Sequence, residues 1–325
     1  MKDYKGILIY VEQNEGIIHK VSYELINKAK ELCKQSNSPL YCLVLGDEGI
    51  DVKELNYCGA DKVFYMKDGC FENPEEYLFK ENIVKFVKEY KPETILIGAT
   101  NFGRSLAPRI AAALKIGLTA DCTDLKMDED GKVIQVRPAF SNNIFAHIKS
   151  KGFPQMATVR YKEFNEAERN EKRDINVSVI EPYVRSYDKV SWIQKFKEEN
   201  FDITEAEVVV AAGRGIKKAE DLHMLHKLAS LLGGEIGASR ALVDTGMIGS
   251  THQIGYSGNR VKPKLYIACG ISGAPQHIAG MKESEVIVAI NSDPSAPIFN
   301  IADYGYVGDL YEVIPKMIEK INSSK

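Results

Sequence analysis

Two turns in the last third of the chain combine glycine with side chains that bind anions. Gly213-Arg214-Gly215 follows the apolar run Val208–Ala212, and a turn from Gly270 to His277 follows the apolar run Leu265–Cys269. Glycine lets a backbone approach a ligand closely, and arginine presents a rigid fork that matches phosphate oxygens. These residue types point to a site for a phosphate-bearing ligand. The spacing of the first turn alone, which is not Gly-x-Gly-x-x-Gly, favours an ordinary tight turn with a surface arginine.

The second turn also carries residues that could start a helix and hold negative charge. Pro275 suits the first position of a helix, whose free N–H groups would form an anion site together with the Ser272 hydroxyl. His277 would lie in the first helical turn, where it could donate a hydrogen bond to an anionic ring oxygen such as a reduced flavin presents. A structural histidine satisfied by its neighbours is the other interpretation, and spacing does not separate the two.

Three further polar segments could contribute to the same site. The turn from Asn291 to Pro294 follows the apolar run Val286–Ile290. It could bind a ribose or adenine edge, although its spacing favours an ordinary turn. The segment from Gly237 to Arg240 places a hydroxyl beside a guanidinium, and the segment from Gln253 to Gly258 is a short polar loop with two glycines. Neither of these last two segments identifies a ligand by itself.

The turns need parallel strands to bring them together, and the C-terminal third supplies such strands. Val208–Ala212, Leu265–Cys269 and Val286–Ile290 are continuous apolar runs, and helices are expected over Ala219–Leu232 and Gly308–Ile321. Continuous apolar runs between amphipathic helices are typical of a parallel sheet with helices on both faces. Ligands of open α/β sheets bind outside the carboxyl ends of the strands, so the three turns should converge on one site.

The first half of the chain shows the same alternation of strand and helix. Its apolar runs predict strands over Gly6–Val11, Leu40–Leu45, Lys62–Tyr65 and Thr94–Gly98, and helices over Val21–Cys33, Glu76–Lys88 and Ser105–Leu114. After Gly117 we expect extra antiparallel strands on one side of this domain, over Cys122–Lys126, Val133–Arg137, Gln155–Arg160 and Asp174–Ile180. A charged and aromatic stretch then marks a boundary, which predicts a first domain over 1–187, a linker over 188–204 and a second domain over 205–325.

Length and composition exclude several classes of protein. The 325 residues suit two or three domains, and a net charge of -3 gives no basic face for nucleic acid. No apolar stretch is long enough for a signal peptide or a membrane span, so we expect a cytoplasmic protein without membrane insertion. The six cysteines include no Cys-x-x-Cys pair. An iron–sulfur cluster held by this chain is therefore excluded.

Together these segments resemble the alpha subunit of electron transfer flavoproteins. The resemblance is closest from Lys264 to Leu310, where Leu265-Tyr266-Ile267-Ala268 leads into Gly270-Ile271-Ser272-Gly273-Ala274 and Gln276-His277, and it continues through Asn291 and Asp293-Pro294. The segment from Val208 to Ser257 matches in order. The first domain matches more loosely, chiefly over Gly103–Pro108 and Leu118–Cys122. The resemblance covers nearly the whole chain.

The resemblance implies a fold, a cofactor and a set of partners. The fold is α/β, with an N-terminal nucleotide-binding-like domain on a parallel sheet and a C-terminal doubly wound domain that binds one FAD. The first domain would contact an electron transfer flavoprotein beta subunit, which would carry AMP or a second FAD. The protein would be an electron carrier subunit rather than an enzyme, and it would pass single electrons between a flavin dehydrogenase, such as an acyl-CoA dehydrogenase, and an acceptor.

The alternative that the family leaves open is an electron-bifurcating complex. Such a complex would use NADH and ferredoxin or flavodoxin together with an acyl-CoA dehydrogenase, and the residues that decide it lie mostly in the partner. Two interpretations from other classes are a stand-alone nucleotide-binding or hydrolysing protein and a purely structural role. The first domain has no glycine-rich phosphate loop with lysine. A structural protein would not need so many glycine turns with polar tips.

The resemblance also assigns residues to the FAD. Arg214 would contact the phosphate or adenosine side, Arg240 would lie over the flavin ring, and Ser257 would hydrogen-bond near its N5 atom. The full set that the resemblance implies is Arg214, Ser239, Arg240, Gln253, Ile254, Gly255, Tyr256, Ser257, Gly270, Ser272, Gly273, Ala274, Pro275, Gln276, His277, Asn291, Asp293, Asp309 and Leu310. Many relatives have Gln-Thr where this chain has Tyr256-Ser257. We expect Arg240, a helix N-terminus and His277 to stabilise the anionic semiquinone over the oxidised ring by positive charge.

Overall fold

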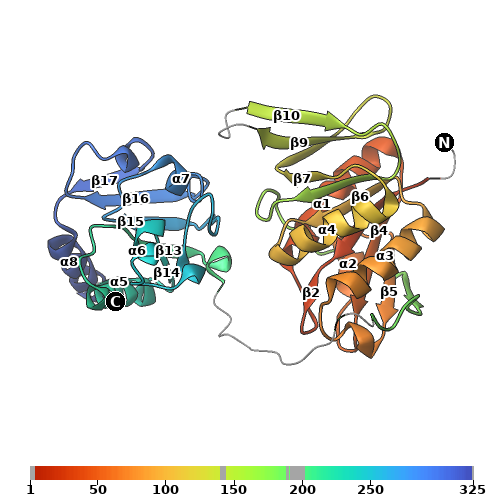
Figure 1. The fold of residues 1–325 in the computed structure, drawn as a ribbon, viewed down its shortest axis with the longest axis horizontal. Coiled ribbons are helices and arrows are strands. Elements are labelled where there is room, and N and C mark those ends of the chain that lie inside the picture. Colours follow the sequence, from red (N-terminus) through yellow and green to blue (C-terminus); the bar gives the residue numbers. More distant parts are fainter. Residues whose placement is uncertain (1–3, 140–143, 188–189, 191–201, 324–325) are drawn as a thin grey trace. The chain divides into compact units, whose positions relative to one another are not determined.

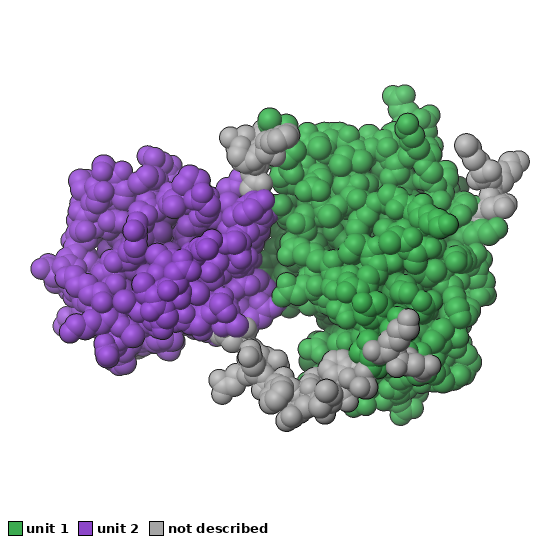
Figure 2. All heavy atoms as spheres, in the orientation of Figure 1, with its two compact units in different colours: residues 1–193 green, residues 194–325 purple. Residues whose placement is uncertain are grey.

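Two compact units make up the chain, Met1–Ile193 and Gln194–Lys325 (Figure 2). The structure is a computed structural model that describes residues 4–139, 144–187, 190 and 202–323. Most of the predicted linker, 188–204, lies outside these described residues. Within them, no helix is both long enough and apolar enough to cross a bilayer.

The first unit is built on a seven-stranded parallel sheet with the order β12-β5-β4-β1-β6-β11-β7 (Figure 1). Its strands are β1 (Ile7–Val11), β4 (Leu40–Gly46), β5 (Lys62–Lys67), β6 (Thr94–Gly98), β7 (Thr119–Cys122), β11 (Gln155–Val159) and β12 (Val177–Ile180). Helices α1 (Lys20–Ser36) and α2 (Lys53–Cys58) pack on one face. Helices α3 (Glu76–Tyr90) and α4 (Asn101–Leu114) pack on the other. This is the parallel-sheet domain that the apolar runs predicted.

An antiparallel sheet of β8 (Asp124–Met127), β9 (Val133–Ala139) and β10 (Ile144–Lys149) extends the first unit. The prediction of antiparallel strands is confirmed for β9 and wrong for β11 and β12, which pair in parallel with β6 and β5. The predicted strand Cys122–Lys126 is split, with β7 in the parallel sheet and β8 in the antiparallel one. Asp121 has a positive φ of 58° near this division, a conformation that turns the chain.

The second unit is a five-stranded parallel sheet with the order β14-β13-β15-β16-β17. Its strands are β13 (Val208–Ala212), β14 (Glu235–Ala238), β15 (Leu265–Cys269), β16 (Val286–Asn291) and β17 (Tyr304–Val307). Helices α5 (Leu222–Leu231) and α8 (Leu310–Ser323) share a buried cluster on one face. The loops that carry Ile254 and Val261, together with the short 3-10 helix Pro297–Asn300 that carries Ile298, cover the other face. The order turns back between β13 and β15, so the carboxyl ends of these two strands form a switch point where α/β sheets bind ligands.

The turns after β13 and β15 cross in direct contact at that switch point. The N–H of Gly213 donates to the Cys269 carbonyl at 2.8 Å, and the N–H of Gly215 donates to the Gly270 carbonyl at 3.1 Å. A Cβ atom on Gly213 would overlap the carbonyl oxygen of Gly270. Gly270 itself has a φ of +65°, which other residues adopt at a cost. Glycine is therefore required at the crossing for steric reasons.

We expect Gly213→Ala to destabilise the second unit by about 1–3 kcal/mol, because the added methyl group must push the two turns apart. Gly249→Ala is the matched control, since its Cβ would meet only the Thr251 hydroxyl, at 3.7 Å. Urea unfolding, read by hydrogen exchange of peptides from β13 and β15, measures the difference. Equal stability of the two variants would contradict the steric requirement.

Candidate functional site

A cavity of about 890 Å³ opens where β13, β14, β15 and β16 end, entirely within the second unit. Its volume lies within the range of cofactor pockets, about 300–1,000 Å³. All of the predicted FAD-binding residues line it except Gly273, Pro275 and Asp293. The expected convergence of the polar turns on one site is therefore what the structure shows.

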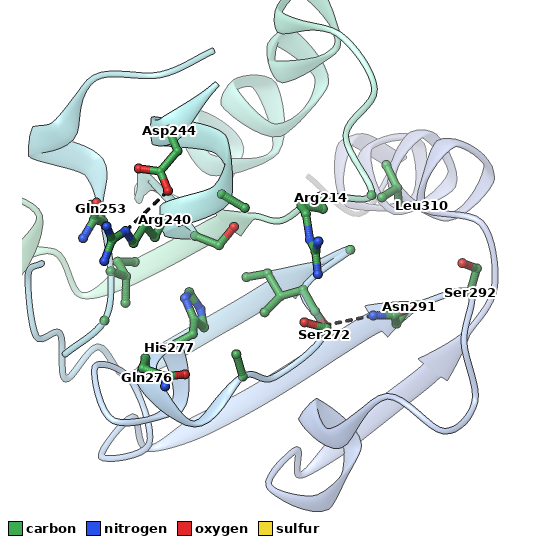
Figure 3. Close-up of a pocket in the computed structure, with 18 of the residues that line it drawn as sticks. Arg214, Arg240, Asp244, Gln253, Ser272, Gln276, His277, Asn291, Ser292 and Leu310 are labelled. Atoms are coloured by element: carbon green, nitrogen blue, oxygen red, sulfur yellow. Dashed lines mark hydrogen bonds and ion pairs between the residues drawn. The ribbon is translucent and has the colours of Figure 1, made fainter. Parts of the chain in front are cut away.

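The labelled side chains, most of them charged or polar, lie in two groups along the cavity (Figure 3). Arg240, Gln253, Gln276 and His277 form one group, from α6 (Arg240–Asp244), the loop after it and α7 (Pro275–Ile278). Arg214, Asn291, Ser292 and Leu310 form the other, from the turn after β13, the end of β16 and the start of α8. An elongated ligand could therefore meet a guanidinium in each group.

Ser239 brings an unpaired hydroxyl to the cavity wall. It follows β14 directly, and its backbone N–H donates to the Ala212 carbonyl at 2.9 Å, which anchors it beside β13. Its Oγ atom is buried and has no hydrogen-bond partner among the described residues. A buried polar atom without a partner costs about 1–3 kcal/mol, which a ligand group in the cavity would recover.

Arg240 lies in the first turn of α6 and is paired with Asp244, one helical turn later. Its Nε atom is 3.4 Å from the Asp244 carboxylate, and the side chains are 70% and 61% exposed. Exposed pairs of this kind contribute about 0–1 kcal/mol, so Arg240 remains free to turn toward a bound anion. Asp244 also lines the cavity, and the sequence analysis missed it. Residues four apart face each other on a helix, but the sequence analysis expected no helix over Arg240–Asp244.

His277 is buried at 6% exposure, and the structure corrects the charge expected of it. Burial lowers the pKa of His277 to about 4, and an interaction with the Ile254 backbone opposes this shift in part. The ring is therefore neutral at neutral pH, so the expectation that it contributes positive charge is wrong for the ligand-free protein. Helix α7 has only four residues, so its dipole contributes little positive potential at its N-terminus.

The loop that carries Tyr256 and Ser257 is fixed by backbone contacts at both ends. Ile254 N–H donates to the Ala238 carbonyl at 2.8 Å, and Tyr256 N–H donates to the Gln276 carbonyl at 2.7 Å. The Tyr256 ring is 67% exposed, and the Arg260 guanidinium lies 5.5 Å from its centroid. The Ser257 hydroxyl accepts a hydrogen bond from the Gln253 amide at 3.3 Å. The loop thus links the end of β14 to α7 and presents two hydroxyl-bearing side chains at the cavity.

The three predicted residues outside the lining support the turns. Asp293 Oδ1 accepts hydrogen bonds from the Ser295 N–H at 2.9 Å and from its hydroxyl at 2.6 Å. Gly273 has a φ of +87° where its turn packs on Ile298, and Pro275 begins α7. Asn291, which does line the cavity, donates from its amide to the Ile271 carbonyl at 2.9 Å.

Seven lining residues lie outside the predicted set, although three of them, Gly215, Ile271 and Ser292, belong to turns that the sequence analysis named. The seven are Gly215, Lys217, Ala241, Asp244, Ile271, Ser292 and Tyr311. Tyr311 ties the turn after β13 to α8, because its hydroxyl accepts from the Lys217 N–H at 2.9 Å and donates to Asp221 at 2.6 Å. Adjacency to Arg214 and Leu310 was the available signal. The contact between Lys217 and Tyr311 joins residues 94 apart in sequence, so only the fold reveals it.

The fold and the cavity define an α/β protein with a cofactor-sized cavity at the switch point of its second sheet. The model for the electron transfer flavoprotein domain matches residues 7–184. The model for the electron transfer flavoprotein FAD-binding domain matches residues 202–282.

Three curated relatives match over nearly the whole chain. An electron transfer flavoprotein subunit alpha of Thermoanaerobacterium thermosaccharolyticum is 44% identical over 100% of both chains. The LctC subunit of a lactate dehydrogenase (NAD(+),ferredoxin) of Acetobacterium woodii is 46% identical over 98% of this chain and 77% of the relative. An acryloyl-CoA reductase electron transfer subunit beta of Anaerotignum propionicum is 38% identical over 100% of this chain and 98% of the relative. The chain belongs to the electron transfer flavoprotein alpha subunit family.

The low pKa of His277 predicts a pH dependence of stability. In the unfolded chain a histidine has a pKa of about 6.5, so between about pH 6.5 and pH 4 the unfolded state binds more protons than the folded state. The stabilisation is complete above that window and is lost as the pH falls through it, by up to about 3 kcal/mol.

Urea unfolding of the FAD-free chain between pH 7 and pH 4 measures this dependence. His277→Gln should lower the slope of stability against pH within the window, and His147→Gln, which replaces an exposed histidine of β10, is the control. A slope that is the same in His277→Gln as in the unmodified chain would contradict a buried neutral ring.

Proposed function

We propose that the cavity holds one FAD in an extended pose, and that this alpha subunit relays single electrons as part of a heterodimer with a beta subunit. The observation that carries the proposal is the pair of guanidinium-bearing groups along one cavity at the switch point of the second unit. Bound there, FAD supplies one-electron redox chemistry. The match of residues 202–282 to the family's FAD-binding domain supports this cofactor over other nucleotides.

The chain's own residues fit the two ends of such a cofactor. Arg214, on the turn after β13, would hold the phosphate and adenosine side together with Asn291 and Leu310. Ser239 and His277 would serve the flavin side, because the buried Ser239 hydroxyl has no hydrogen-bond partner in the described part of the chain and the buried Nδ1 atom of His277 has none of normal geometry there, with only the Ile254 backbone nearby. Because the crossing turns carry glycines without Cβ atoms, their backbone could approach a ligand in the cavity closely.

Arg240 supplies the main positive charge on the flavin side, since His277 is neutral. Its guanidinium would favour electron density on the ring, and the Asp244 carboxylate offsets part of that field. His277 would act through a hydrogen bond instead of a charge. The residues therefore adjust the reduction potential by a balance between one cation and one anion at the cavity mouth.

We expect opposite shifts of the first one-electron potential when the members of this ion pair are neutralised. Arg240→Ala should lower the potential by about 40 mV, equivalent to about 1 kcal/mol for one electron, and Asp244→Asn should raise it by a smaller amount. Lys264→Ala is the control, because Lys264 is an exposed, paired cation just before β15, at the opposite end of this strand from the cavity. Spectroelectrochemical titration measures all three, and an unchanged potential in Arg240→Ala would contradict the assignment.

The proposed partners follow from the family and from the printed names of relatives. The first unit would contact an electron transfer flavoprotein beta subunit that carries AMP or a second FAD. The electron donor or acceptor would be a flavin dehydrogenase such as an acyl-CoA dehydrogenase. The relative named as an electron transfer subunit of acryloyl-CoA reductase supports a partner that acts on acyl-CoA substrates.

A bifurcating complex is the second candidate function. The observation that favours it is the relative LctC, which belongs to a lactate dehydrogenase named for both NAD(+) and ferredoxin. In such a complex the beta subunit would hold a second FAD that takes electrons from NADH, and this chain would pass one of them onward. The cavity of this chain would bind FAD in either case, because the simple carrier and the bifurcating complex differ in the partner subunit.

Flavin counting on the purified heterodimer separates the two candidates. A simple carrier should contain one FAD and one AMP per heterodimer, and NADH should not reduce its flavin. A bifurcating form should contain two FAD and should be reduced by NADH. A heterodimer without any FAD would contradict both candidates.

A further inference from the structure

Tyr266 is a buried tyrosine at the centre of the second sheet, with no solvent exposure. It lies on β15 and faces the apolar cluster that contains Val209, Ile271 and Ile287. Among the described residues its hydroxyl has a single hydrogen-bond partner, the Nε2 atom of His277, at 2.8 Å. A tyrosine in this cluster is unusual, because phenylalanine would fill the same space without a polar atom to satisfy.

The direction of this hydrogen bond follows from what each group can offer. Burial raises the pKa of Tyr266 well above 10, and burial lowers the pKa of His277 to about 4. At neutral pH the contact therefore joins a protonated hydroxyl to a neutral imidazole. If Nε2 carried the ring proton and donated it, the Tyr266 proton would be left without an acceptor in an apolar core, at a cost of about 1–3 kcal/mol. The hydroxyl must therefore donate, and Nε2 must accept.

This direction places the imidazole proton on the other ring nitrogen. His277 is one of the residues that line the cavity. Its Nδ1 atom is buried and makes no hydrogen bond of normal geometry with the described residues, and the ring's further polar neighbour is the Ile254 backbone. A neutral imidazole has one N–H donor and one acceptor, so fixing Nε2 as the acceptor makes Nδ1 the donor.

We propose that Tyr266 is a positioning residue that holds His277 in the tautomer with the proton on Nδ1, so that the ring presents a neutral hydrogen-bond donor to an acceptor atom in the cavity. The ligand group that this donor fits is a ring carbonyl or ring nitrogen that gains electron density, and it does not fit a cation or another N–H. The same contact keeps His277 from taking up a second proton, because Nε2–H would again displace the Tyr266 proton from its acceptor.

The tautomer itself follows from the structure alone, whereas its effect on a flavin rests on the proposed function. A donor fixed in place before the electron arrives needs no reorganisation when the ring becomes more negative. Tyr266 would thus favour the reduced cofactor over the oxidised one without touching it. Removal of its hydroxyl lets the Nε2–H tautomer compete, since Nε2 then has no partner.

The first test measures the tautomer in the FAD-free chain. Nitrogen-15 labelling of the six histidines, with His277 assigned by His277→Gln, shows which ring nitrogen carries the proton. The expected result is proton on Nδ1 in the unmodified chain and a mixture of tautomers in Tyr266→Phe. Tyr10→Phe, which removes another buried tyrosine hydroxyl in the first unit, should leave the His277 signals unchanged. Proton on Nε2 in the unmodified chain, or no change in Tyr266→Phe, would overturn the proposal.

The second test is a double-mutant cycle on the FAD-loaded heterodimer. Tyr266→Phe should weaken the binding of reduced FAD relative to oxidised FAD by about three- to tenfold, the range of one neutral hydrogen bond. In a His277→Gln background the same substitution should change this ratio by less than about twofold. An equal loss in both backgrounds would show a structural effect of Tyr266 and would overturn the link to the cofactor. Failure to bind FAD at all would contradict the proposed function and leave the tautomer result standing.

Discussion

The crossing of two glycine turns at the switch point is the constraint on which the rest of the second unit depends. Gly213 and Gly215 lie against Gly270 with backbone hydrogen bonds and no room for a side chain. This contact sets how closely the turns after β13 and β15 approach each other, and Arg214 projects from the middle of one of them. Ser239 is held by the carbonyl of Ala212, at the end of the same strand, so the position of the crossing also fixes the start of α6 and Arg240.

The proposed flavin side of the cavity combines neutral hydrogen-bonding side chains with one exposed cation, Arg240. The buried side chains Tyr266 and His277 form a neutral pair, while the ion pair of Arg240 and Asp244 lies at the exposed rim. A neutral interior avoids the cost of desolvating an isolated charge, which would be large in this apolar cluster. Arg240 can respond to a ligand because its pairing with Asp244 is weak. This division suits a cofactor whose charge changes by one unit at each step.

Much of the fold could be predicted because buried parallel strands appear in the sequence as continuous apolar runs. The strands β13, β15 and β16 lie where the sequence placed them, and so do the turns that follow them. The strand β14 was missed because it has four residues, one of them Gly237, and β17 because all four of its side chains are exposed. The parallel pairing of β11 and β12 depends on contacts between distant segments, which local patterns do not encode. The site residues came from the family resemblance, since spacing alone left ordinary turns as alternatives.

The neutral charge state of His277 could not be predicted either, because it also depends on contacts between segments that are distant in the sequence. It depends on the depth of the ring in the core and on the Tyr266 hydroxyl, and no motif in the sequence records either. The pairing of Asp244 with Arg240 was also missed, because a spacing of four residues brings side chains together only on a helix, and no helix was expected over Arg240–Asp244.

The measurement that tests the central claim most directly is the electron density of FAD in a crystal of the purified heterodimer. The account predicts one FAD in the cavity of the second unit, with its isoalloxazine ring between Arg240 and His277 and its adenosine beside Asn291 and Leu310. The ring oxygen nearest His277 should lie within hydrogen-bond distance of Nδ1. A flavin bound elsewhere on the chain, or in this cavity with its two ends reversed, would contradict the account.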